Sequence, residues 1–91
     1  MAHSVSLSWA ASPDAVSGYN VYRGSAAGAE TTLLTPSPIT ALVFTDSNPV
    51  LGEDFYIVKS VLNGVDSVAS NEVSTVILPA PPTALVITAS N

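Results

Sequence analysis

The side chains best suited to catalysis are few and widely spaced in this 91-residue sequence. His3 is the single histidine and cysteine is absent, so the usual ligands of zinc cannot gather into a cluster. Serine is abundant, but no Gly-x-Ser-x-Gly turn is present and no internal histidine could activate a serine as a nucleophile. We expect His3 to be a solvated terminal residue. The sequence predicts no catalytic residue and a protein that is not an enzyme.

The acidic residues raise the question of a calcium site, because hard cations require several converging oxygens. Most of them adjoin turn signals, and none follows the Asp-x-Asp-x-Asp-Gly spacing of a calcium loop. No glycine-rich phosphate loop is present either. We therefore predict neither a metal site nor a bound cofactor, and expect turn capping and solubility from these acids: Asp14, Asp46, Glu53, Asp54, Asp66 and Glu72.

Charge excludes several classes of partner. Arg23 and Lys59 are the only basic residues, and the net charge is −5. Two cations cannot neutralise a row of phosphates, so we expect no binding of nucleic acid and no docking on an anionic membrane. No apolar run approaches the ~20 residues that span a bilayer, and the start at Met1 has no signal-peptide pattern.

Two aromatic residues could form a ligand platform. Trp9 ends the alternating stretch Ser4–Trp9, which predicts a place in the core. Tyr22 is the best candidate for exposure, because its neighbours Tyr19 and Val21 occupy the opposite, inner face of the same stretch. One exposed tyrosine makes a poor carbohydrate platform, so we expect Tyr22 to cover the sheet and a small-molecule ligand to be absent.

The elements that position these residues are predicted to be short strands. Alternating patterns and flanking turn signals predict strands over residues 4–9, 18–24, 30–35, 41–45, 55–62, 73–78 and 84–88. Asn63-Gly64 predicts a hairpin, because both residues tolerate positive φ. No segment has a helical apolar stripe. The sequence predicts an all-β fold, an immunoglobulin-like two-sheet antiparallel β-sandwich.

The same alternation predicts which side chains of each strand point inward and form the core. If Lys59 points to solvent, Tyr56, Val58 and Ser60 point inward. The predicted core residues are Val5, Leu7, Trp9, Tyr19, Val21, Phe44, Tyr56 and Val58.

Four stretches resemble a fibronectin type III domain of the bacterial extracellular type: Ser4–Trp9, Gly18–Arg23, Phe44–Asp46 and Ala69–Ser74. The resemblance covers residues 4–78 and implies fibronectin type III topology, with these stretches on strands B, C, E and G and Trp9 at the centre of the sandwich. It also implies an extracellular or cell-surface location.

The resemblance implies a strand A ahead of strand B, whereas three residues precede Ser4. Pro81–Ser90 is similar to strand A of a following repeat. We therefore divide the chain into a sandwich, residues 1–78, and a Pro-rich linker with an A-like strand, residues 79–91. Leu85, Ile87 and Ala89 share one face of that strand and are candidates for strand exchange between chains. Exchange through residues 83–89 would give a swapped dimer or a head-to-tail chain, and a disordered tail is the alternative.

These features favour a non-catalytic structural spacer or protein-interaction module of a multidomain secreted or cell-surface bacterial protein. Its expected partners are other domains of the parent chain and copies of itself. Two alternatives stay open. One is an accessory carbohydrate- or protein-binding domain that uses the loops at residues 11–17 and 63–68. The other is an engineered scaffold, because Met1-Ala2 is typical of a cloned start.

Overall fold

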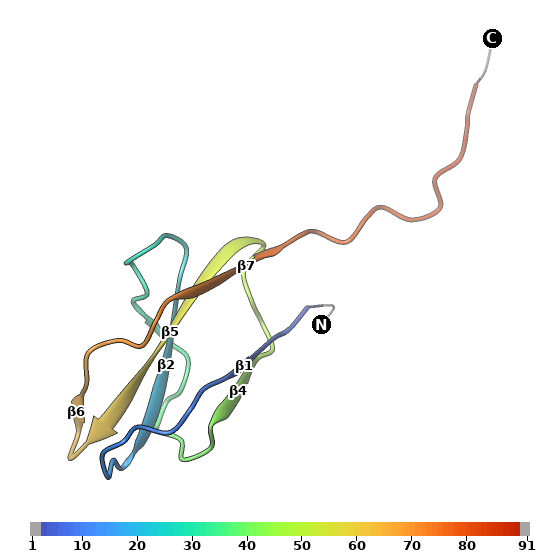
Figure 1. The fold of residues 1–91 in the computed structure, drawn as a ribbon. Helices are drawn as coiled ribbons and strands as arrows, with labels where there is room; N and C mark the ends of the chain where they lie inside the picture. The colour runs from blue at the N-terminus through green and yellow to red at the C-terminus, as the bar shows by residue number, and fades with distance from the viewer. Residues whose placement is uncertain (1–2, 90–91) are drawn as a thin grey trace.

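The computed structural model describes residues 3–89, and Met1, Ala2, Ser90 and Asn91 lie outside the described residues. Within this range seven strands form two antiparallel sheets that face each other as a small β-sandwich, and helices are absent from it (Figure 1). The all-β fold class expected from the sequence is confirmed. The described residues accordingly contain no helix able to cross a membrane.

The smaller sheet consists of β1 (Val5–Ser8) and β4 (Val43–Asp46). Burial alternates along β1, with its apolar side chains half-buried and its serines exposed, as period-2 patterning predicts. The pairing extends past the strand ends, because the Trp9 N–H donates to the Leu42 carbonyl at 3.0 Å.

The larger sheet is built around β5. In this sheet β5 pairs with β2 over the full length of β2, and a short strand adds to the other edge of β2. Two further short strands pair in succession with the opposite edge of β5. The strands are β2 (Gly18–Gly24), β3 (Thr32–Leu33), β5 (Gly52–Leu62), β6 (Val65–Asp66) and β7 (Val73–Ile77).

The strands differ from the predicted ones in several places, and the strand expected over residues 30–35 is reduced to β3. The fifth strand begins at Gly52, not at Phe55. The returning strand predicted over residues 73–78 is β7, which ends at Ile77. The short strand β6 was not predicted, and it follows the Asn63-Gly64 turn, whose residues both have positive φ (53° and 80°), as expected. Residues 84–88 form no strand, because no neighbouring strand pairs with them.

The core lies between the two sheets. The β2–β5 register places Tyr19, Val21 and Tyr56 on the inner face, and all three are buried. The rings of Trp9 and Tyr19 pack edge to face with centroids 5.8 Å apart. The remaining predicted core residues, together with Trp9, are half-buried: Val5, Leu7, Phe44 and Val58. The small sheet therefore covers only part of the large one.

The outer face of the large sheet also buries side chains. Ile57 is opposite Tyr22 in the register, and Val61 is opposite Gly18. Both aliphatic side chains are buried, at 8% and 3% exposure, although they lie on the face of β5 opposite to Tyr56. The sequence-based core omitted them, because alternation assigns only one face of a strand to the interior.

Candidate functional site

A buried ionic cluster occupies the end of the sandwich where β7 finishes. Arg23 is on the inner face of β2, and its Nη1 donates to Asp46 Oδ2 at 2.8 Å. The Tyr56 hydroxyl donates to the same oxygen at 2.8 Å, and the Asn48 N–H donates to Oδ1 at 3.1 Å. Burial alone would raise the pKa of Asp46, but these three hydrogen bonds outweigh it and hold the pKa below its ordinary value.

Asp54 belongs to the same buried region. Its side chain is 1% exposed, and its Oδ2 has no hydrogen-bond partner. Burial raises the pKa of Asp54, although the nearby charge of Arg23 acts in the opposite direction. Asp46 and Asp54 are thus structural residues of the interior. This corrects the expectation that both simply cap turns at the surface, although Asp46 does accept the turn hydrogen bond from Asn48.

Tyr22 is held in a polar cluster on the outer face of the large sheet. Its hydroxyl donates to Asp66 Oδ2, and this hydrogen bond is the main cause of its raised pKa. Asn20 Nδ2 donates to the other Asp66 oxygen at 3.3 Å, and the Lys59 ammonium lies 5.1 Å from the centre of the Tyr22 ring. The ring is half-buried, and the lysine occupies the position that a stacked sugar would need.

The loops predicted to share one pole do lie together. Ser17 donates its N–H to the Val61 carbonyl at 2.7 Å, and its hydroxyl accepts from the Asn63 N–H at 3.5 Å. A shallow hollow at this pole is lined by both loops, including Val16 and Val65. No group of three or more His, Cys, Asp or Glu side chains within residues 3–89 could hold a metal ion, and His3 is half-buried just before β1.

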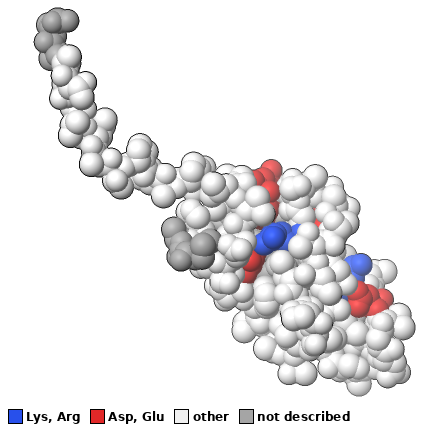
Figure 2. Space-filling model, turned by 180° about the vertical axis from the view of Figure 1, so that it is seen from behind, with Lys and Arg blue, Asp and Glu red and all other residues white. Residues whose placement is uncertain are grey.

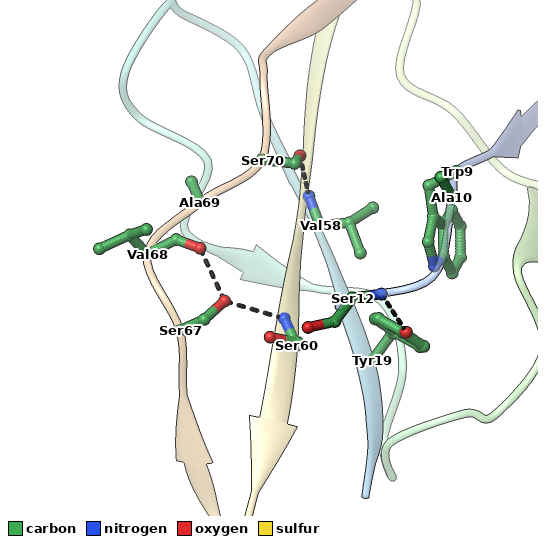
Figure 3. Close-up of a pocket in the computed structure, with 10 residues that line it drawn as sticks. All are labelled: Trp9, Ala10, Ser12, Tyr19, Val58, Ser60, Ser67, Val68, Ala69 and Ser70. Carbon is green, nitrogen blue, oxygen red and sulfur yellow. Dashed lines mark hydrogen bonds between the residues drawn. The ribbon is translucent and has the colours of Figure 1, made fainter. Parts of the chain in front are cut away.

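An open groove runs along one side of the sandwich, between β1 and the segment that carries β7. It comprises two adjoining hollows, which share Trp9, Val58 and Ser70. The first lies between Trp9 and residues 67–70 (Figure 3) and has a volume of about 160 Å³, comparable to an apolar cavity that accepts benzene. The second lies between Leu7 and Val73. None of the residues lining either hollow is charged.

Serine side chains complete the β5 edge of this groove. Ser67 accepts a hydrogen bond from the Ser60 N–H through its hydroxyl and donates its own N–H to the Ser60 carbonyl, at 3.0 and 2.8 Å. Ser70 makes the same two contacts with Val58, at 3.0 and 2.8 Å. These hydroxyls replace backbone acceptors between β6 and β7, so the N–H groups of Val58 and Ser60 on this side of the groove have hydrogen-bond partners (Figure 3).

The opposite wall is an unpaired strand edge. In the described residues β1 pairs with β4 alone. The Trp9–Leu42 hydrogen bond places Trp9 in a hydrogen-bonded pair, and antiparallel ladders alternate such pairs with open ones. The N–H and C=O groups of Ser6 and Ser8 therefore point away from β4, toward the open side. A free edge of this kind is a template for another strand.

The chain beyond β7 leaves the sandwich as an extended arm (Figure 1). Leu85 and Ile87 are 93% and 85% exposed, and Ala89 is exposed as well. The arm contains no charged residue, whereas charged side chains are visible on the body from which it extends (Figure 2). The three strand-exchange candidates thus lie outside the sandwich of their own copy.

Comparison with known proteins gives no relative. No protein-family model, no curated protein and no solved structure matches this chain at a significant level. The fold and the groove define the class of the protein as a small β-sandwich domain in which the edge of β1 beside the groove is unpaired within the described residues.

Proposed function

We propose that this chain is a non-catalytic interaction module, in which the free edge of β1 accepts an extended segment from a partner protein. The single observation that carries the proposal is the unpaired edge of β1 beside an uncharged groove. Strand addition to an exposed edge uses main-chain hydrogen bonds for affinity and side-chain pockets for selectivity. Ser6 and Ser8 supply the hydrogen bonds, and the two hollows supply the pockets.

The module is proposed to act as a spacer or docking unit in a multidomain protein at the cell surface or outside a bacterial cell. This setting rests on the resemblance of residues 4–78 to fibronectin type III domains. The low content of charged residues, 10%, and the proline-rich arm suit one unit of a string of domains.

The experiment is a nuclear magnetic resonance titration with extended peptides. The protein is the full chain carrying Leu85→Ser and Ile87→Ser, which alter only exposed residues of the arm. Uncharged peptides of alternating Val and Thr are added, and the amide signals of Ser4, Ser6 and Ser8 and the indole signal of Trp9 are followed. Shifts concentrated on β1 are expected. If millimolar peptide moves none of these signals, the proposal is wrong.

A second candidate function is supported by the shallow hollow between the loops at residues 11–17 and 63–68. An accessory binding domain would bind a carbohydrate or a protein there. The same titration with a glycan panel tests it, with shifts of Val16 and Val65 as the expected result. Unchanged signals at both positions would rule out a carbohydrate ligand at this pole.

A further inference from the structure

We infer that the segment accepted by the groove is the arm of a second copy of this chain, residues Ala84–Ala89, which pairs antiparallel to β1. This inference rests on the proposed function and names its partner. Leu85 and Ile87 would enter the two hollows, because alternate residues of a strand share one face. Val86 and Thr88 would then point outward.

Charge and polarity match the arm to the groove. The chain carries a net charge of −5, yet neither the residues lining the hollows nor those after Glu72 include a charged side chain. The arm also presents large aliphatic side chains that are mostly exposed in one copy: Leu78, Leu85, Val86 and Ile87 are 70%, 93%, 69% and 85% exposed. A contiguous exposed apolar segment of this kind marks an interaction surface.

The arm of one copy is too short to pair antiparallel to β1 of the same copy. The Val5–Asp46 pairing and the Arg23–Asp46 ion pair place the start of β1 at the end of the sandwich where β7 finishes (Figure 1). A strand antiparallel to β1 must enter at the opposite end, near Trp9. The residues from Leu78 to Thr83 reach at most about 20 Å when extended. A direct path that crosses ~10 Å between the sheets and runs ~15 Å along β1 is about 18 Å long, so almost none of this reach is left for the reversing turn.

The direction of entry limits how two copies can be arranged. A donor arm must reach the Trp9 end of the acceptor, while the acceptor's own arm leaves from the other end. Copies stacked end to end therefore make contacts between two different surfaces, and such heterologous contacts extend into open chains. Two copies that lie side by side in opposite directions would instead exchange arms reciprocally and close as a dimer. The sizes of the species formed distinguish these two assemblies.

The experiment uses two full-length variants that each lack one half of the contact. The tail variant carries Leu85→Ser and Ile87→Ser. The edge variant carries Ser6→Pro, which removes an N–H that the β1–β4 pairing does not use. Analytical ultracentrifugation over a wide concentration range measures assembly of the unmodified chain, of each variant and of an equimolar mixture, at about 0.15 M salt.

The unmodified chain is expected to associate as its concentration rises, as a ladder of head-to-tail species or as a closed dimer, and each variant is expected to be monomeric. Loss of two buried aliphatic side chains should weaken association by at least about 100-fold. The mixture should form a 1:1 dimer and nothing larger, because only the edge variant has a working arm and only the tail variant has a working edge. Higher salt should strengthen assembly, because it screens repulsion between copies of net charge −5.

An unmodified chain that stays monomeric at millimolar concentration overturns the inference, as does a mixture without the 1:1 dimer when both variants are folded. If the edge variant does not fold, hydrogen exchange on the unmodified chain decides instead. The amides of Ser6 and Ser8 must then exchange more slowly as the concentration rises. Protection that is independent of concentration would show that each arm docks on its own β1. Failure here with binding of the Val–Thr peptides would leave the proposed function intact and refute only the choice of partner.

Discussion

Removal of the Asp46 carboxylate is expected to be among the most damaging single changes in this domain. In Asp46→Ala the Arg23 guanidinium, 16% exposed, and the Tyr56 hydroxyl both lose their acceptor. Breaking a buried ion pair costs roughly 3–5 kcal/mol. Arg23 keeps a hydrogen bond of 3.2 Å to the Asn48 carbonyl, so the lower end of about 3 kcal/mol applies. That is a large fraction of the ~5–15 kcal/mol by which domains are stable.

The assay is urea unfolding at low micromolar concentration, followed by the fluorescence of Trp9, the single tryptophan. Tyr56→Phe removes one charge-assisted hydrogen bond and should cost about 1.5–3 kcal/mol. Asp14→Ala is the matched control, because Asp14 is an exposed acid, and it should change the free energy of unfolding by less than about 0.5 kcal/mol. If Asp46→Ala differs from this control by less than about 1 kcal/mol, the cluster does not stabilise the fold in the way described. Because the pKa of Asp46 is depressed, its contribution should also disappear as the pH falls through the folded-state value.

Three further outcomes follow from other contacts. The unmodified chain should gain stability on mild acidification, and Asp54→Asn should abolish this gain. The pKa of Asp54 is raised in the folded chain, so as the pH falls the folded chain takes up this proton before the unfolded chain does. Urea unfolding at a series of pH values between about 7 and 4 measures the gain. Gly24→Ala should cost about 1–3 kcal/mol in thermal unfolding, because the added Cβ would lie 2.2 Å from the Ala29 carbonyl oxygen; unchanged stability would mean that this loop moves freely. Ser70→Ala should cost about 0.5–1.5 kcal/mol and speed amide exchange at Val58, and exchange at the rate of the unmodified chain would contradict the bridging role of the serine.

The sequence predicts strands well where one face is apolar and the other polar. Alternation located β1 and β2, and positive φ in the Asn63-Gly64 turn follows from the residue types alone. The short strand β6 and the side-chain pairing that follows it were not predicted in this way. Ser67 and Ser70 there hydrogen-bond to β5 through side chains, and serine carries no signal that separates this use from ordinary exposure.

The buried charges were the main omission on the inner face. Arg23 follows Val21 by two residues, so the alternation that placed Val21 inside also pointed Arg23 inward. A charged residue at an inward position is normally rejected from a core unless a partner is present. The partner, Asp46, is distant in sequence and becomes visible only once β1 and β4 are packed on β2. The free edge of β1 could not be predicted for the same reason, since the partners of a strand are set by the fold and not by the local sequence pattern.

The placement of the start of β1 and the end of β7 at one end of the sandwich has a mechanical consequence. A force that separates the segments flanking Val5 and Ile77 acts across the strands, so the β1–β4 hydrogen bonds break one pair after another. Bonds loaded in sequence yield at low force, whereas bonds loaded together along the strands resist it. A lone copy pulled between residues 3 and 89 should therefore peel open at β1, and single-molecule force spectroscopy would detect a high-force rupture if this view is wrong. In a head-to-tail chain an inserted arm would instead be pulled along its own axis, so tension would be borne by the contact between neighbouring copies.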